Sequence, residues 1–331
     1  MLWLAYILCT GLIVYSGIKL SKYGDIIAEK LELGGVWIGM VLLATVTSIP
    51  ELVTGISSVT FADVPDIAVG NALGSCVLNM LILAGLDVVR SDAISSKAHF
   101  GNILSAGFAI LLLSITAMSL FIGKYFYPVD WIGSYSFLII LLYFISVKTV
   151  YAFERKQISE FVTGVALELK YQTVSMKKAV FNFSVNGGVV VIAALILPEV
   201  GERLAAETGL GQIFVGNVLI AFSTALPELV VSVSAIRMNA VDLAIGNLFG
   251  SIIFNVFILA IDDIFFIQGP LLSYVDQNHI ISAISALAMT SIAVIGLTYR
   301  ASKKRLLLSW HSLGIVVIYI FNLILLYRLR K

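Results

Sequence analysis

Long apolar segments dominate this chain and restrict what it can fold into. Ten segments are almost free of charge: 2–20, 34–60, 66–88, 99–122, 128–148, 178–198, 211–236, 241–262, 277–299 and 307–327. A helix of about 20 apolar residues crosses the hydrocarbon layer of a membrane. Only 12% of the residues are charged, which is too few to cover a water-facing surface. We therefore predict an all-α polytopic membrane protein with ten transmembrane helices.

The polar segments between these helices divide the chain into two halves. The longest, residues 149–177, is predicted to link a first five-helix repeat (1–148) to a second (178–331), and residues 157–169 are compatible with a short interfacial helix. With the N-terminus outside, 16 Lys and Arg side chains fall on the cytoplasmic side and 5 on the outer side. This bias obeys the positive-inside rule. It places the linker in the cytoplasm and both termini outside a plasma (inner) membrane.

An internal repeat relates the two halves. Residues 38–55 (IGMVLLATVTSIPELVTG) match 215–232 (VGNVLIAFSTALPELVVS), and residues 67–83 (IAVGNALGSCVLNMLIL) match 243–259 (LAIGNLFGSIIFNVFIL). Glu51 corresponds to Glu228 at an offset of 177 residues. Five helices in each half mean that the second half enters the membrane upside down. Such inverted repeats are the architecture of many secondary transporters.

Each half carries a proline and a glutamate inside an apolar segment. Pro50 has no amide hydrogen, so it frees the carbonyl of Val46 four residues earlier. A free carbonyl in a membrane needs a partner or a lined cavity, and a carboxylate there marks an ion path. Glu51 lies one helical turn from Thr47, on the same face. The second half repeats this arrangement at Thr224, Pro227 and Glu228.

Further oxygen-bearing side chains stand at matching positions. Ser75 and Asn79 are four residues apart and share one helix face, and so do Ser251 and Asn255. No Lys or Arg stands at the depth of either glutamate, so the neutralising charge has to come from solution. Hard cations such as Ca²⁺ take six to eight oxygen ligands. The lack of a nearby His or Cys pair in the sequence argues against zinc or copper.

Four motifs, at 44–51, 70–79, 221–228 and 246–255, resemble those of the cation/Ca²⁺ exchanger superfamily. Its two repeats carry a Gly-Thr-Ser-x-Pro-Glu core and a Gly-x-x-x-Gly-Ser-x-x-x-Asn/Asp core. The chain is most similar to the prokaryotic Na⁺/Ca²⁺ exchangers, over both repeats and the ten-helix plan. The resemblance implies a secondary active antiporter, not an enzyme, that exchanges Ca²⁺ for Na⁺ by alternating access. It implies no cofactor and no required protein partner beyond the lipid bilayer, and nucleic acid is not expected.

The resemblance also implies which residues hold the ions. Ca²⁺ is expected at Glu51 and Glu228, with backbone oxygens of Thr47 and Thr224. Na⁺ is expected at the same four residues and at Ala44, Ser75, Asn79, Ala221, Ser251 and Asn255. The first and sixth helices are expected to slide past the core.

The motifs depart from the family pattern at several positions. Val46 and Ser223 stand where Gly is common before Thr, and Ala225 stands where Ser is usual. Asn255 replaces an Asp of several relatives, which leaves only the two glutamates at the centre. Their charge of −2 is neutralised by one Ca²⁺. The bulkier Val46 is expected to tighten a Na⁺ site or alter stoichiometry.

Other functions are weaker hypotheses. In a H⁺/Ca²⁺ antiporter of the same fold the two glutamates would be protonated. The Thr before each Pro-Glu favours Na⁺, because proton-coupled relatives tend to show Gly-Asn-x-x-Glu there. A K⁺-dependent exchanger is disfavoured by Asn255. The sequence contains no H-E-x-x-H or diphosphate motif for an intramembrane enzyme. A passive channel is disfavoured because closed carboxylate sites favour occlusion.

The remaining polar residues are assigned structural or interfacial positions. Asp87 and Asp263 correspond across the halves, and we expect them, like Asp262, to be solvated at the membrane interface. Asn71 and Asn247 are expected to cap or tie helices. The three histidines, His99, His279 and His311, fall at helix ends or loops, which disfavours a proton relay.

Overall fold

The computed structural model of the chain describes residues 2–30, 44–89, 94–96, 100–122, 128–161, 174–237, 241–299 and 308–329. Within these ranges the chain is helical and contains no β-strand. Eight helices are long and apolar enough to cross a membrane, and one bent pair would make a ninth. The all-α membrane fold is therefore confirmed. The count of ten helices stays a prediction, since segment 34–60 is only partly described.

The helices begin and end close to the predicted segments, with three extensions. In chain order they are α1 (Leu2–Lys30), α3 (Ile49–Thr60), α4 (Pro65–Val89), η1 (Ile94–Ser96), α5 (Phe100–Ile122), α6 (Ser134–Phe161), α7 (Met176–Thr208), α8 (Gly211–Phe214), η3 (Val215–Ile220), α9 (Ala221–Thr224), α10 (Leu226–Arg237), α11 (Val241–Phe265), α12 (Leu271–Tyr274), α13 (His279–Tyr299) and α14 (Trp310–Arg328). Helices α1, α6 and α7 are longer than predicted. Residues 149–161, assigned to the linker from the sequence, continue α6, and residues 162–173 lie outside the described ranges.

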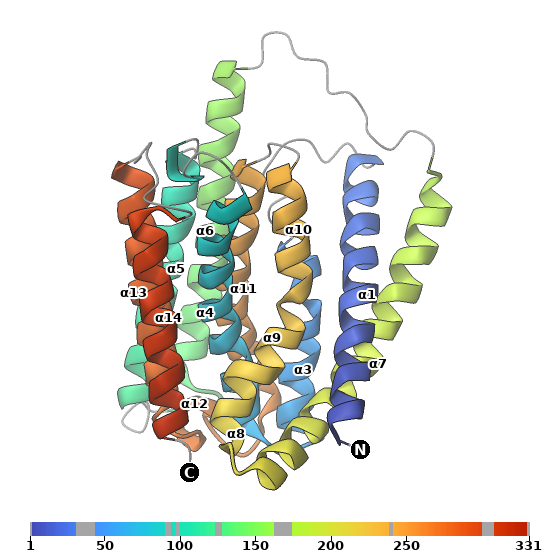
Figure 1. The fold of residues 1–331 in the computed structure, drawn as a ribbon, viewed down its shortest axis with the longest axis vertical. Coiled ribbons are helices and arrows are strands. Elements are labelled where there is room, and N and C mark those ends of the chain that lie inside the picture. The colour runs from blue at the N-terminus through green and yellow to red at the C-terminus, as the bar shows by residue number, and fades with distance from the viewer. Residues whose placement is uncertain are drawn as a thin grey trace.

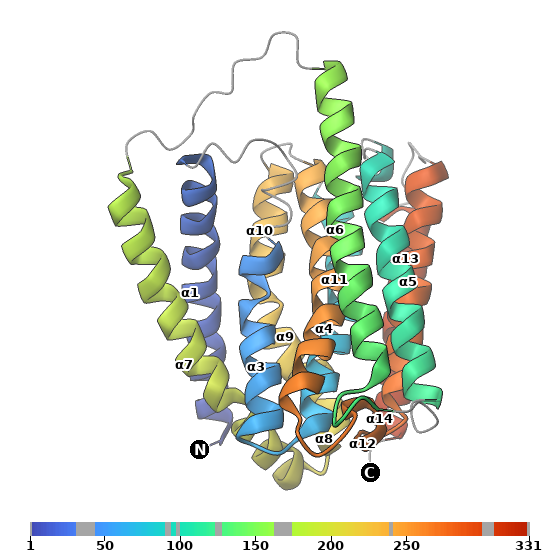
Figure 2. The same ribbon diagram turned by 180° about the vertical axis from the view of Figure 1, so that it is seen from behind.

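The helices form a bundle around α4 and α11, which pack against each other and are the most buried of the membrane-crossing helices (Figures 1 and 2). Helices α1 and α7 lie side by side at one edge, and α5 packs on α13. Each of these contacts joins a helix of the first half to the helix at the same place in the second half. Both termini lie at one end of the bundle, and the extension of α6 projects from the other (Figure 1).

Two helices are broken, each two residues before a proline. In the first half residues 44–47 are helical, Ser48 forms a turn, and α3 begins at Ile49. In the second half α9 ends before Ala225, α10 begins at Leu226, and the axis bends by 45°. The segment before this second break, η3, is a π-helix. The breaks place Glu51 and Glu228 in the first turns of α3 and α10.

The aspartates near the ends of α4 and α11 are buried rather than interfacial. Asp87 accepts hydrogen bonds from Ile94 N (2.9 Å), Ser309 N (3.2 Å), Ser312 Oγ (2.5 Å) and the Ser309 hydroxyl. Asp263 accepts from Gly133 N (2.8 Å), Tyr135 OH (2.7 Å), Ser136 Oγ (2.6 Å) and Leu271 N (2.6 Å). The prediction of interfacial solvation is wrong for both, because they satisfy the free N–H groups that begin α14 and α6. Each aspartate thus ties its half to the last helix of the other half.

Candidate cation-binding site

Glu51 lies at the centre of the bundle, in contact with α4 and the second half. Its side chain is fully buried. Ser75 Oγ donates to Glu51 Oε1 at 3.4 Å, and Asn71 Nδ2 donates to the Glu51 carbonyl at 3.4 Å. The hydroxyl of Thr224 lies beside the same carboxylate and donates to Asn71 Oδ1 at 3.0 Å. Asn71 of α4 therefore ties α3 to the second half, in line with the expectation that it ties helices.

Glu228 has a similar but richer environment. It is fully buried as well. Ser48 Oγ, at the break of the first half, donates to Glu228 Oε1 at 2.9 Å. The hydroxyls of Thr47 and Ser251 also lie beside this carboxylate. Each glutamate thus meets a threonine of the other half, and the two carboxylates are close enough to repel each other.

Many polar atoms of this region have no hydrogen-bond partner. Fourteen buried side-chain nitrogen and oxygen atoms among the described residues are unpartnered, and seven of them belong to the predicted ligands. These seven lie in Glu51, Asn79, Glu228, Ser251 and Asn255. Buried polar groups are normally satisfied. A cluster of unsatisfied oxygens around two carboxylates is the arrangement that a cation would complete.

All ten predicted ligands are buried and lie on the helices around the two breaks, namely Ala44, Thr47, Glu51, Ser75, Asn79, Ala221, Thr224, Glu228, Ser251 and Asn255. In the part of the chain that the structure describes, the ion pairs involve other residues, Arg203 with Glu199 and His279 with Asp66. The described part of the chain contains no group of three or more His, Cys, Asp or Glu side chains that could hold a metal ion. The charge of the two glutamates is thus not balanced by a described side chain.

Two of the residues that depart from the family pattern, Val46 and Ser223, contact the helices at the edge of the bundle. Val46 packs in a small apolar cluster with Leu20 of α1 and Val190 of α7. Ser223 Oγ donates to Leu219 O at 2.9 Å and lies 2.8 Å from the Tyr6 hydroxyl of α1. The expectation that Val46 tightens a Na⁺ site or alters stoichiometry stays a prediction. Both side chains line the surface on which α1 and α7 pack.

A pocket reaches this region beside Ala44, at the break in the first half. Its lining includes Ala44, Thr45, Ser146, Gly246 and Gly250, from the first break and from α6 and α11. The corresponding glycines of α4 are covered. An added Cβ atom would lie 3.1 Å from the Asn217 backbone at Gly70, and would collide with the Asn217 backbone at Gly74. The site is thus more open beside α11 than beside α4.

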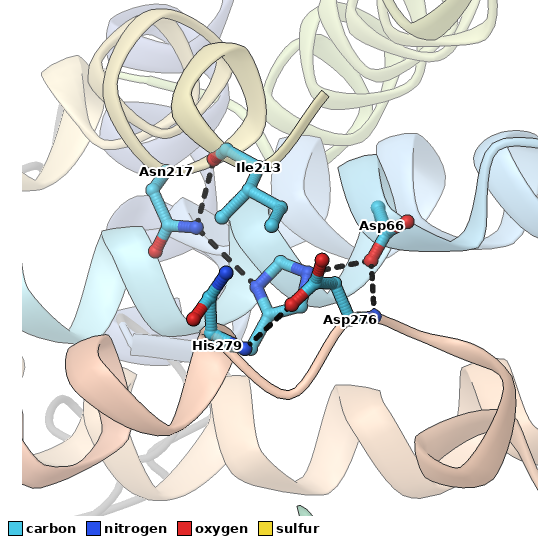
Figure 3. A network of polar contacts seen from close by, with 6 residues as sticks. Asp66, Ile213, Asn217, Asp276 and His279 are labelled. Atoms are coloured by element: carbon cyan, nitrogen blue, oxygen red, sulfur yellow. Dashed lines mark hydrogen bonds and ion pairs between the residues drawn. The ribbon is translucent and has the colours of Figure 1, made fainter. Parts of the chain in front are cut away.

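A buried histidine network that the sequence did not reveal holds this covered side. His279 lies between Asp66 and Asn217 (Figure 3). Its Nε2 is 2.9 Å from Asp66 Oδ1, and its Nδ1 is 3.4 Å from Asn217 Nδ2. Asn217 Nδ2 also donates to Ile213 O at 2.9 Å. The network joins the starts of α4 and α13 to the π-helix η3, so His279 has a structural place and no contact with the glutamates.

Comparison with known proteins identifies the family. The family described as sodium/calcium exchanger protein matches residues 1–151 and 178–328. The chain belongs to this family. The sodium/calcium exchanger MaX1 of Methanosarcina acetivorans is 26% identical in an alignment that covers 92% of this chain and 93% of MaX1.

Solved structures have the same fold at low identity. The H⁺/Ca²⁺ exchanger CAX matches with a TM-score of 0.74 and 13% identity, over 98% of this chain and 82% of CAX. The sodium-calcium exchanger NCX_Mj matches with a TM-score of 0.61 and 21% identity, over 98% of this chain and 99% of NCX_Mj. The chain is thus a multi-pass membrane protein of a family of cation/Ca²⁺ exchangers.

Proposed function

We propose that this exchanger is a Na⁺/Ca²⁺ antiporter whose transported ions bind between Glu51 and Glu228. The observation that carries the proposal is the pair of buried, mutually repelling carboxylates, for which no described Lys, Arg or His supplies a counter-charge. A buried pair of like charges is strongly unfavourable unless cations neutralise it. One Ca²⁺ balances both charges, and several Na⁺ ions would do so with help from neutral oxygens.

The proposed ligands are oxygens, which are the donors that Ca²⁺ prefers. Ca²⁺ would take the two carboxylates and backbone oxygens near Thr47 and Thr224. The Na⁺ sites would add Ala44, Ser75, Asn79, Ala221, Ser251 and Asn255. The unpartnered atoms of Asn79, Ser251 and Asn255 support their assignment.

Alternating access would follow from the two breaks and from the edge helices. The pocket beside Gly246 and Gly250 is also lined by Ser146, in the part of α6 that leads to its extension, whereas Gly70 and Gly74 are closed by η3. We propose that α1 and α7, which pack on each other at the edge, slide past the core to close one side and open the other. Val46 and Ser223 would lie on the sliding surface.

We also propose the inverted repeat, 1–148 and 178–331, joined by the cytoplasmic linker 149–177. The matching breaks at Ser48 and Ala225 and the reciprocal contacts of Asp87 and Asp263 support it. Both termini lie at one end of the bundle, which agrees with an outside position for both in a plasma (inner) membrane.

The test is Ca²⁺ uptake into proteoliposomes loaded with Na⁺, compared with vesicles that carry only a pH gradient. Wild type, Glu51→Gln and Glu228→Gln are measured beside Glu199→Gln, which removes an exposed carboxylate of α7. We expect Na⁺-driven uptake in wild type and Glu199→Gln, and none in the other two variants. Uptake driven only by the pH gradient would instead assign the H⁺/Ca²⁺ alternative, and no uptake under either gradient would overturn the proposal.

A further inference from the structure

A third buried carboxylate, Asp262 in α11, lies outside the predicted ligand set. Both of its oxygens are buried and without a hydrogen-bond partner among the described residues. The adjacent Asp263 is the opposite case, because four donors surround it. The prediction that Asp262 is an interfacial residue is wrong, and helix capping does not explain it.

Asp262 extends the row of polar residues that leads from the central site. It follows Asn255 by seven residues, so it lies on the same face of α11, about 10 Å further along the axis. Its carboxylate rests against Gly55 of α3, where an added Cβ atom would collide with both oxygens. Gly55 follows Glu51 by four residues, about 6 Å along α3. Thr54 Oγ1, in between, is buried and unpartnered as well.

The row follows α11 toward the end of the bundle that carries both termini (Figure 2). Helix α11 ends there, and the contact between Asp262 and Gly55 joins α11 to α3. The first half has no equivalent, since Leu86 occupies the position that corresponds to Asp262 at the offset of 176. Asp262 is therefore not one of the paired ligands of the repeat.

Among the described residues, the surroundings of Asp262 supply few ligands for a metal cation. Ca²⁺ needs six to eight oxygens at 2.3–2.6 Å, and Gly55 of α3 lies directly beside both carboxylate oxygens. An ionised carboxylate without partners is strongly unfavourable at this depth. A proton neutralises the group without needing a coordination shell.

The titratable groups near Asp262 are acidic or satisfied. Glu51 is the titratable residue of α3, and Asp263 follows on α11. Tyr135 of α6 donates its hydroxyl to Asp263, and Asp66 of α4 is paired with His279 of α13. Helix α5 has no titratable side chain, and α12 has Tyr274. Arg237 of α10 lies four residues before α11 begins, whereas Asp262 lies near the end of α11. No described positive charge is placed to hold Asp262 in its ionised form.

We propose that Asp262 is a proton-binding site on the path between the central carboxylates and the terminal end of the bundle. It holds a proton while this half of the path is closed, and exchanges it with water when the path opens. The proton site stands on the geometry of Asp262 alone, whereas its place on a transport path rests on the proposed function.

Infrared spectroscopy tests the proton directly. The purified E51Q/E228Q double variant lacks both central carboxyls, so a neutral acid band in the carbonyl region that shifts in D₂O can be assigned by one further change. We expect D262N in this background to remove the band, and D262L, which copies Leu86, to do the same if D262N folds poorly. A spectrum unchanged by both substitutions, or no acid band in the double variant, would overturn the proposal.

Transport tests the place of the proton on the path. In oriented vesicles with a fixed Na⁺ gradient, we expect wild-type Ca²⁺ flux to depend on the pH of the compartment that faces the termini. D262N should retain flux and lose this dependence, while pH on the other side acts equally on both proteins. Equal dependence in wild type and D262N would overturn the path. An absence of Ca²⁺ flux in wild type would contradict the proposed function and leave the infrared result to decide the proton site.

Discussion

The glycine motifs of the two halves have the same sequence pattern but different surroundings. Gly70 and Gly74 of α4 pack against the π-helix η3, whose backbone would collide with a Cβ atom at Gly74 and lie 3.1 Å from one at Gly70. Gly246 and Gly250 of α11 line a pocket beside the first break. A repeat of this kind can adopt one packing in one half and another in the other half. Alternating access requires that one of two such glycine contacts be closed while the other is open.

The largest expected effect is on access to the two regions. Thr45→Cys lies in the pocket at a partly exposed position, and Asn217→Cys lies in the closed contact, where it is buried. We expect a membrane-impermeant thiol reagent to modify the first from the side of the α6 extension and to leave the second unmodified. The native cysteines, Cys9 and Cys76, are buried and give a low background. Equal modification of both variants would remove the distinction between an open and a closed side.

Asp87 and Asp263 sharpen the comparison, because the two halves use them in the same way. Asp87→Ala and Asp263→Ala each leave several buried donors unsatisfied, so we expect each to lower the free energy of unfolding by roughly 3–5 kcal/mol. Thermal unfolding in detergent measures this, with the exposed Glu199→Ala as the control. A large effect for one aspartate alone would mean that the two ties are not equivalent.

A smaller effect is expected at the closed contact itself. Gly74→Ala forces η3 away from α4, and overpacking of this kind costs about 1–3 kcal/mol. We expect a lower melting temperature and weaker Na⁺-driven Ca²⁺ uptake, because the covered side no longer closes. Gly107→Ala is the matched control, since nothing lies within 4 Å of its added Cβ atom. Identical behaviour of the two variants would show that close packing at Gly74 has no role.

The smallest effect is expected at the breaks. Ser48 donates to Glu228, whereas Ala225, its counterpart, has no hydroxyl to offer Glu51. Removal of one such hydrogen bond costs about 1 kcal/mol. We therefore expect Ser48→Ala to weaken the apparent Ca²⁺ affinity roughly fivefold. Ser58→Ala, which removes a bond within α3, should leave the affinity unchanged. An unchanged affinity in Ser48→Ala would mean that this hydroxyl does not support the site.

Much of the fold could be predicted because a helix that crosses lipid must be long and apolar. Apolar length defined the helices. The prolines predicted a freed carbonyl in each half, but not that both helices break two residues before the proline. The ends of helices were less predictable. The charged residues 149–161 do not prevent α6 from continuing to Phe161. Nothing in the local sequence shows that η3 is a π-helix, since this depends on its packing against Gly70 and Gly74.

The candidate site was predictable at its centre and not at its edges. A glutamate after a proline in an apolar segment is a strong local signal, and its repetition made it stronger. Asp87, Asp262 and Asp263 gave the same local signal of an acid near a helix end. Their different environments depend on distant contacts, such as those with Ser309, Gly55 and Ser136. No pattern along the chain distinguishes them.

The most direct test of the account is equilibrium binding of radioactive Ca²⁺ to the purified protein, with Na⁺ as competitor. Wild type is compared with Glu51→Gln and Glu228→Gln, after each variant has been shown to retain wild-type helix content. We predict that wild type binds a single Ca²⁺ that Na⁺ displaces, and that neither variant binds it measurably, because one site needs a carboxylate from each half. Wild-type affinity in either variant would contradict the claim that the two glutamates form one site.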